Sequence, residues 1–293
     1  MSSVQQGILA PVPALARYLT FSLHSPGAAH RALADMNGLG HGADRVIGLG
    51  LSLLLALDVT LDGMREFPGQ SAPGIDIPAT PAALWCWLRG DDRGRLLHDS
   101  RALASALAPA FQLRECIDGF RYGSGLDLTG YEDGTENPQG EAAREAAIVS
   151  DAGRHVDGSS FVAVQRWLHD LDVFASTSQQ QQDHVIGRRR SDNEELDDAP
   201  ESAHVKRTAQ EDFDPPAFLL RRSMPWAEGT AVGLVFVAFG RSFDAFETLL
   251  RHMSGADDGI TDALFTFTRP QSGAYFWCPP AAGEGLDLGL LGI

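Results

Sequence analysis

Hydrophobic and polar positions alternate in several short runs, and longer stretches with helical spacing separate these runs. In the first half of the chain, alternation with aromatic and β-branched residues predicts strands at residues 17–24, 45–55, 82–88 and 111–122. Apolar residues that recur every three or four positions predict helices at 25–36 and 91–107. Ser25 and Pro26 are typical of a helix start, with Ser25 as the cap. The order of elements is therefore β-α-β followed by β-α-β.

A similar order begins again after a polar, alanine- and glutamate-rich joint at residues 141–158. Strands are predicted at 160–168, 218–222, 230–239, 264–268 and 273–278, and helices at 170–185 and 242–253. This repeated order is that of ferredoxin-like units, in which an antiparallel sheet carries peripheral helices. We predict an α+β fold of two such halves, residues 1–140 and 159–293, joined in one compact unit like a dimeric α+β barrel.

Composition narrows the possible functions. Hydrophobic residues make up 44% of the 293 residues, which supports a full core, and the net charge of -16 opposes binding to a nucleic-acid backbone. The three cysteines are widely spaced, so they predict neither a zinc site nor a disulfide framework. The segment from Met1 to Pro13 has no secretory-signal pattern, and no apolar run is long enough to span a bilayer. We expect a cytoplasmic protein that binds no nucleic acid and no membrane.

The first stretch that suggests chemistry is Gly-Tyr-Glu-Asp-Gly at residues 130–134, followed by Thr-Glu-Asn-Pro. Glycine permits positive φ and close approach of other groups, so the two glycines would hold the Asp133 carboxylate in a fixed direction. The pattern fits an acidic surface turn as well as a catalytic or metal-binding loop. A partner elsewhere in the chain is needed to choose between them.

Among the nine histidines, His204 is the strongest candidate for that partner. There is no His-x-x-x-His pair and no His-Glu motif, which argues against a zinc hydrolase. His204 follows a proline and small residues, and Arg221 lies seventeen positions later. A single imidazole suits the axial position of a haem iron. A carboxylate that moves a proton and an arginine that stabilises negative charge would suit peroxide cleavage. From spacing alone, this is one arrangement among several.

The chain resembles the dye-decolorising peroxidases, and within them the compact bacterial B-type group. The Gly-x-x-Asp-Gly motif and its Thr-Glu-Asn-Pro continuation carry the resemblance. Further matching stretches extend over nearly the whole chain: 11–13, 16–19, 48–50, 88–94, 186–188, 203–205 and 273–277. The resemblance implies one haem b per chain, held in the second half with His204 as iron ligand. It implies that Asp133 and Arg221 lie on the peroxide-binding side.

The family pattern also assigns the residues around Arg221. The order Arg, any residue, Asn or Ser, apolar residue, Pro aligns with residues 221–225 and selects Arg221 over Arg222. Neighbours on a strand point to opposite faces, so only one of the two arginines would face the haem. Ser223 then becomes a third polar group on the peroxide side, where many relatives have asparagine.

Two further residues are implied as supports of the cofactor. Arg188, in the family's Ile-Gly-Arg stretch, would pair with a haem propionate, because a guanidinium binds a carboxylate through two hydrogen bonds. The second ring nitrogen of His204 should donate to a carboxylate. Asp262 and Asp258 are the candidates, and Asp262 is favoured.

The activity implied is reduction of hydrogen peroxide and oxidation of dyes, phenolics or other one-electron donors through a ferryl intermediate. The alternative is a haem-handling protein of the same superfamily, which binds haem or removes its iron. Tyr131, Trp167 and Trp226 are candidates by type for passing electrons to bulky dyes, although ordinary packing is the favoured explanation for each. The acidic run 192–198 is either a solvated loop or an Mn²⁺ site. A homo-oligomer is expected. Residues 286–293 faintly resemble the docking peptide of nanocompartment cargo, or else form a folded edge.

Overall fold

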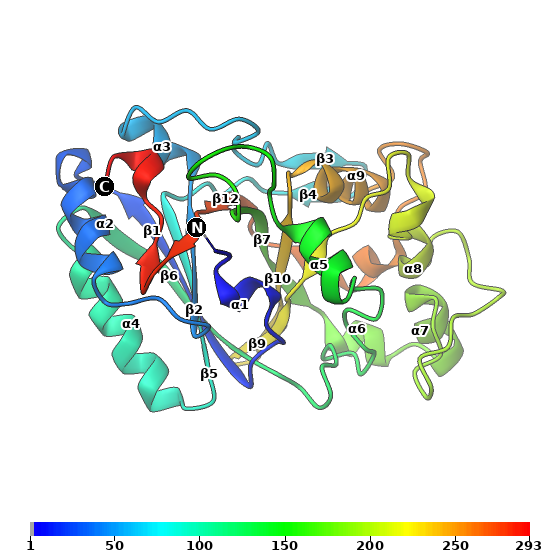
Figure 1. Ribbon diagram of the computed structural model, residues 1–293. Coiled ribbons are helices and arrows are strands. Elements are labelled where there is room, and N and C mark those ends of the chain that lie inside the picture. Colours follow the sequence, from blue (N-terminus) through cyan, green and yellow to red (C-terminus); the bar gives the residue numbers. More distant parts are fainter. Residues whose placement is uncertain (1–2) are drawn as a thin grey trace.

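The computed structural model describes residues 3–293, and these residues build one closed barrel with helices around it (Figure 1). The described residues do not include Met1 and Ser2. These two residues begin the segment from Met1 to Pro13, in which we expected no secretory signal. The barrel strands from the first half are β1 (Leu15–Leu23), β2 (Arg45–Leu49), β5 (Leu84–Gly90) and β6 (Phe111–Phe120). Those from the second half are β7 (Ser160–His169), β9 (Met224–Glu228), β10 (Ala231–Gly240) and β12 (Ala274–Cys278).

Both halves have the same strand order. The first is arranged β2-β5-β1-β6 and the second β12-β7-β10-β9, with antiparallel neighbours throughout these strands. The halves join edge to edge where Leu49 of β2 pairs with Trp277 of β12, and where Gly119 of β6 pairs with Trp226 of β9. The predicted α+β fold with two ferredoxin-like halves is confirmed, and the joined edges close the sheet into a barrel.

Shorter strands and helices complete the chain. The remaining strands are β3 (Gln70–Ala72), β4 (Ile75–Ile77), β8 (Leu220–Arg221), β11 (Thr268–Pro270), β13 (Ala281–Ala282) and β14 (Gly285–Leu286). The α-helices are α1 (Gln6–Leu9), α2 (Ala29–Asn37), α3 (Leu51–Ala56), α4 (Arg93–Leu107), α5 (Gly140–Ala147), α6 (Leu171–Ala175), α7 (Gln179–Ile186), α8 (His204–Arg207) and α9 (Asp244–Met253). The 3-10 helices are η1 (Pro26–Ala28), η2 (Gln210–Asp212), η3 (Ala263–Thr266) and η4 (Gly289–Leu291).

Alternation along the strands separates an inner from an outer set of side chains. Trp85 and Trp87 of β5 lie on one face, as predicted, and stack on Tyr18 of β1 inside the barrel. Burying one side chain of this kind contributes about 1.5–3 kcal/mol. The outer set in the first half packs directly against α2 and α4, whereas α9 faces the outer surface of β10 in the second half.

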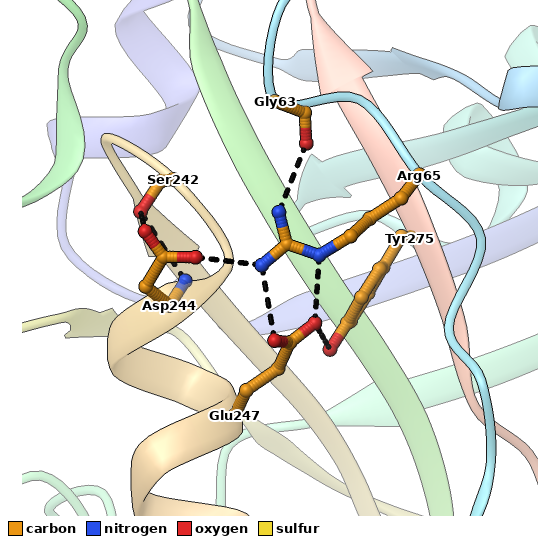
Figure 2. A network of polar contacts seen from close by, with 6 residues as sticks. All are labelled: Gly63, Arg65, Ser242, Asp244, Glu247 and Tyr275. Carbon is orange, nitrogen blue, oxygen red and sulfur yellow. Dashed lines mark hydrogen bonds and ion pairs between the residues drawn. The ribbon is translucent and has the colours of Figure 1, made fainter.

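The start of α9 is anchored by a polar network that joins the two halves (Figure 2). Arg65 donates from Nε to Glu247 Oε1 at 2.9 Å and from Nη2 to Asp244 Oδ1 at 2.7 Å. The Tyr275 hydroxyl on β12 also donates to Glu247, at 3.2 Å. Because the guanidinium is partly exposed, each ion pair contributes only about 0–1 kcal/mol. The network nevertheless fixes the first turn of the helix whose next turns face the candidate site.

Several local predictions are wrong for identifiable reasons. The strand expected over residues 45–55 ends at Leu49, and α3 follows, because short leucine-rich runs fit a strand and a helix equally well. Gly50 makes the turn between them, and any Cβ there would lie 1.8 Å from the carbonyl oxygen of Ala82. The helix expected over 170–185 is split, because Ser178 forms a capping box that starts α7. The strand expected at 264–268 is η3 followed by β11.

Two smaller expectations also fail. Ser25 makes no side-chain capping bond, and Pro26 begins a 3-10 turn ahead of α2. The strand β9 has no counterpart in the prediction, because Pro225 interrupts its pattern and the stretch resembles a loop.

Candidate active site

A cavity lies between α9 and the outer face of the sheet of the second half, and residues 127–133 of the first half form part of its wall. Its empty space amounts to ≈ 1040 Å³, including the mouth that opens to solvent. The lining is mainly apolar, and β10 and α9 contribute Leu234, Phe236, Phe246, Leu249, Leu250 and Met253 to it. Asp133, His204 and Arg221 also line it. Three residues that the sequence could not place relative to one another therefore meet in one apolar cavity.

The loop of residues 130–134 is shaped by its two glycines. Gly130 has φ +88° and Gly134 has φ +82°, values that residues with a side chain rarely adopt. Between them the chain turns back on itself, with Asp127 N donating to Tyr131 O at 2.9 Å. Both carboxylates of the loop line the cavity, with Glu132 exposed to solvent and Asp133 half-buried in the wall.

The Asp133 carboxyl lies in an environment that disfavours its charge. Burial raises the pKa of Asp133 above its usual value, and this effect is the largest. The positive charge of Arg221 partly offsets it, whereas the nearby Asp127 carboxylate raises the pKa further. An acid with a raised pKa beside a cation is a common arrangement for a group that takes and returns a proton.

Arg221 is presented to the cavity by the edge strand β8. Its Nε is buried and has no hydrogen-bond partner among residues 3–293, so part of the guanidinium remains free for a ligand. Arg222 points to the other side, where its Nη2 donates to Leu9 O at 2.9 Å. Burial, with Arg89 nearby, lowers the pKa of Arg222 to about 10. The two neighbouring arginines therefore occupy different environments, as strand alternation requires.

His204 begins the short helix α8 and is held by a carboxylate from a separate segment. The distance from its Nδ1 to Asp262 Oδ2 is 2.7 Å, and Asp262 is fully buried. The other oxygen of Asp262 accepts from Leu264 N at 2.8 Å. With Nδ1 occupied, Nε2 is the ring nitrogen available to a ligand in the cavity. Asp258 binds Arg207 through both oxygens, at 2.8 and 2.9 Å, so of the two carboxylates weighed it is Asp262 that contacts His204.

Arg188 and Ser223 lie outside the set of residues that line the cavity. Arg188 pairs with Glu136 and, at 3.1 Å, with Glu195. Regular strand structure stops at Arg221 and resumes at Met224, so Ser223 lies between β8 and β9. The Ser223 hydroxyl instead accepts from Val237 N at 3.4 Å. Their roles toward a propionate and toward peroxide stay predictions.

The aromatic candidates differ in their surroundings. Tyr131 and Trp167 line the cavity, and the Tyr131 hydroxyl donates to Asp183 near the surface. Trp226 is buried in the barrel beneath the guanidinium of Arg166, 3.8 Å from the ring centre. In the acidic run, Asp192 pairs with Arg189 at 2.6 Å. Among the described residues, no group of three or more His, Cys, Asp or Glu side chains could hold a metal ion.

One pair in the wall was not anticipated. His169 Nε2 lies 3.1 Å from Asp127 Oδ2, and both side chains are largely buried beside the cavity. Thr129 donates to the other oxygen of Asp127 from both its backbone N–H and its hydroxyl, at 2.8 and 2.6 Å. Asp127 precedes the glycine motif by three residues, but its partner is 42 positions away. Spacing therefore gave no signal for the pair.

Comparisons with known proteins agree with this geometry. A sequence model described as Dyp-type peroxidase, C-terminal, matches residues 125–283. A dye-decolorizing peroxidase of Rhodococcus erythropolis is 30% identical, and the match covers 96% of this chain and 88% of that protein. An encapsulated DyP-type peroxidase from Mycobacterium smegmatis superposes with a TM-score of 0.87 at 27% identity, over 96% of each chain. A DypB variant from Rhodococcus jostii RHA1, solved in complex with heme, superposes with a TM-score of 0.82 at 25% identity, over 93% and 94% of the chains.

The fold, the cavity and these matches define a peroxidase. The chain belongs to the Dyp-type, dye-decolorising peroxidase family, and the family expected from the motif at residues 130–134 is confirmed. Within residues 3–293, no helix combines the length and the apolar character that crossing a bilayer demands.

Proposed function

We propose that this chain is a haem peroxidase that reduces hydrogen peroxide and takes electrons one at a time from dyes, phenolics or similar aromatic donors. The observation that carries the proposal is the meeting of Asp133, Arg221 and His204 in one cavity. A haem-handling protein needs a cavity and an iron ligand, but it has no use for a proton-transferring carboxyl beside a cation. The presence of both Asp133 and Arg221 in the wall of one cavity favours the peroxidase.

The cavity suits one haem b. Apolar side chains of β10 and α9 provide walls for a planar macrocycle, and the imidazole of His204 retains one nitrogen for the iron. Arg221 Nε has no hydrogen-bond partner within residues 3–293, so it remains available to a polar ligand in the cavity. When bound, haem supplies the iron at which the peroxide oxygen–oxygen bond is broken.

The residues of the chain then have separate roles in proton transfer, charge stabilisation and support of the iron ligand. Asp133, in its ionised form, takes the proton from one peroxide oxygen and gives it to the other, which leaves as water. Arg221 stabilises the negative charge that develops on the departing oxygen. Asp262 accepts from His204 Nδ1, which fixes the ring and makes the other nitrogen a stronger electron donor.

Arg188 and Ser223 have supporting roles in this proposal. Arg188 is held by Glu136 and Glu195 at the loop that carries Asp133, and it would exchange one of these carboxylates for a propionate. Ser223 is buried next to the strand end that presents Arg221, and it would reach the peroxide side through a bridging water. Residues 1–140 and 159–293, joined by 141–158, would act as one unit because the two sheets share their edges.

Partners and location follow from weaker observations. Two of the three free cysteines are buried, which suits a reducing, cytoplasmic setting. A homo-oligomer remains our expectation. The encapsulated relative suggests a nanocompartment as partner, but the C-terminal leucines Leu286, Leu288 and Leu291 are buried against the body of this chain. The tail would have to detach before it could dock, so we favour a folded C-terminal edge.

A single preparation tests the function. The protein purified with haem should show a Soret band that shifts when peroxide is added, and it should then oxidise an anthraquinone dye only while peroxide is present. A protein that releases iron from haem but turns over neither dye nor phenol would contradict the peroxidase and support the haem-handling alternative.

A further inference from the structure

The edge strand that carries Arg221 lacks a neighbouring strand on one side. β8 pairs with β10 through Leu220–Phe239 and Arg221–Ala238, and it ends the sheet order of the described residues. Backbone groups on such a free edge need other partners when they are buried. Here a side chain provides them. Arg221 N donates to Asn137 Oδ1 at 2.8 Å, and Asn137 Nδ2 donates to Arg221 O at 3.1 Å.

A second amide ties the same two segments together. Leu219 N donates to Gln210 Oε1 at 2.9 Å, and Gln210 Nε2 donates to Glu136 O at 3.1 Å. Gln210 is buried at the cavity wall. The consecutive loop residues Glu136 and Asn137 are thus connected to the free edge, Glu136 to Leu219 through Gln210 and Asn137 to Arg221 directly. The loop takes the place of the missing strand.

The second glycine of the motif is part of the same arrangement. A Cβ at Gly134 would lie 2.5 Å from Asn137 Nδ2, closer than real contacts allow. Any side chain at this position would therefore push the amide away from Arg221, in addition to straining a backbone with φ +82°. Asp133 is the residue immediately before this glycine. One turn consequently places both Asp133 and the amide that grips Arg221.

We propose that Asn137 is a positioning residue, which sets the separation between Asp133 and Arg221 across the peroxide side of the cavity. The inference rests on the function proposed above for these two residues. Proton transfer and charge stabilisation both depend on placement, and an error of about 1 Å is able to cost roughly 100-fold in rate. Without the amide, the loop and the edge strand would be joined near the site mainly through Gln210.

The chain provides a matched control. Asn37 grips the C-terminal segment in the same way, with Leu286 N donating to its Oδ1 at 2.6 Å and its Nδ2 donating to Leu286 O at 3.2 Å. Asn137→Ala and Asn37→Ala therefore delete the same pair of bonds, one at the cavity and one far from it. We expect both haem-loaded variants to lose similar stability. Only Asn137→Ala should slow the reaction of the haem with peroxide, by about 10- to 100-fold, with the later reductant step unchanged.

Two further measurements separate positioning from a general weakening of the fold. Asn137→Asp keeps the acceptor for Arg221 N and loses the donor to Arg221 O, so its rate should fall between wild type and Asn137→Ala. In the haem-free protein, hydrogen exchange of residues 219–221 should accelerate in Asn137→Ala and stay normal in Asn37→Ala.

A double-mutant cycle identifies the residue through which Asn137 acts. If it acts through Arg221, Asn137→Ala should slow the peroxide reaction little or not at all once Arg221→Leu is present. If the effects of the two substitutions on the peroxide reaction were fully additive, the inference would be overturned. It would also be overturned if Asn137→Ala reacted with peroxide at the normal rate while Arg221→Leu reacted slowly. A normal rate in Arg221→Leu itself would overturn the proposed role of Arg221, and this inference with it.

Discussion

The two sides of the cavity differ in how completely their polar groups are paired. On the His204 side, Nδ1 is bonded to Asp262, and both oxygens of Asp262 have partners. On the opposite side, Arg221 Nε is buried without a partner in the described part of the chain, and burial raises the pKa of Asp133. The backbone of Arg221 is nevertheless fixed by Asn137. The main-chain N–H and C=O groups of Arg221 therefore have partners, whereas its side-chain Nε has none within residues 3–293.

This difference distinguishes residues that hold a cofactor in place from residues that take part in the reaction. A residue that must keep a ligand in place gains from a fully bonded second layer, because that layer fixes its ring and its charge. A residue that must meet a developing charge needs unused hydrogen-bonding capacity until the substrate arrives. This contrast supports the proposal of cofactor retention for the first side and of peroxide chemistry for the second.

The largest effect should come from removing His204, the proposed iron ligand on the side of the cavity that retains the cofactor. His204→Ala leaves Asp262 buried without its partner and gives the iron no imidazole, so the protein should purify with little haem. Absorbance at the Soret band relative to protein gives the haem content. His184→Ala, a histidine outside the cavity lining whose contact to Asp198 is 3.7 Å, serves as control. A His204→Ala protein with stoichiometric, histidine-ligated haem would contradict the assignment.

On the reacting side, the neighbouring arginines give a paired test. Arg221→Leu should keep its haem and lower the rate of the peroxide reaction by about 100- to 1000-fold, the size found when one charge-stabilising donor is lost. Arg222→Leu removes the same charge from the opposite face, so it should affect stability and leave this rate unchanged. Stopped-flow absorbance after mixing with peroxide measures both. Equal rates in the two variants would remove the distinction between the faces.

A milder change tests the support behind His204. Asp262→Asn keeps an oxygen near Nδ1 but removes the negative charge, so His204 becomes a weaker donor to iron. Loss of such a partner typically costs about 10- to 100-fold in affinity or activity. We also expect the reduction potential of the iron to rise. Asp258→Asn, whose carboxylate binds Arg207 instead, should leave the potential unchanged. A spectroelectrochemical titration compares the two variants.

The sequence predicted the fold well where periodicity is long. The helix at Arg93–Leu107 and the strands around Trp85 and Trp277 were found because their patterns extend over many residues. The leucine run after Leu49 was assigned wrongly, because apolar residues alone do not distinguish a buried strand from a helix. The closure of the barrel depends on single residue pairs between strand edges, and such contacts leave no local pattern.

The site was predicted through its motif and the resemblance, and less through spacing. Asp133, His204 and Arg221 do line one cavity, and Asp262 contacts His204, but all four depend on long-range folding for their meeting. Asn137 was quoted as part of the motif without a role, because its partner lies 84 positions away. Ser223 was placed on the face of Arg221 by strand alternation, but it does not line the cavity, and its role stays a prediction.

The smallest expected effect concerns stability, and two carboxyls of one loop should respond with opposite sign. Asp127 is paired with His169, and the pKa of Asp127 is lowered by these bonds although burial alone would raise it. Its contribution to stability is therefore present above the pKa it has in the unfolded chain and is lost as pH falls through its folded pKa. Asp133 has the opposite shift, so folding favours its protonated form, and stability is lost as pH rises through its folded pKa.

At neutral pH, Asp133→Asn should therefore stabilise the haem-free protein while it abolishes proton transfer. A gain on the order of 1 kcal/mol is typical when a functional compromise of this kind is removed. Asp127→Asn should instead destabilise, because His169 loses its ionised partner. Denaturant unfolding measured at neutral pH and again below the pKa that Asp133 has in the unfolded chain checks the sign, since the gain should vanish where Asp133 is protonated in both states. If the Asp133→Asn variant proved less stable than the wild type at neutral pH, the Asp133 carboxylate would be a group that stabilises the loop. Arg221 would then be the one residue on this side of the cavity whose polar group is left unpaired for the reaction.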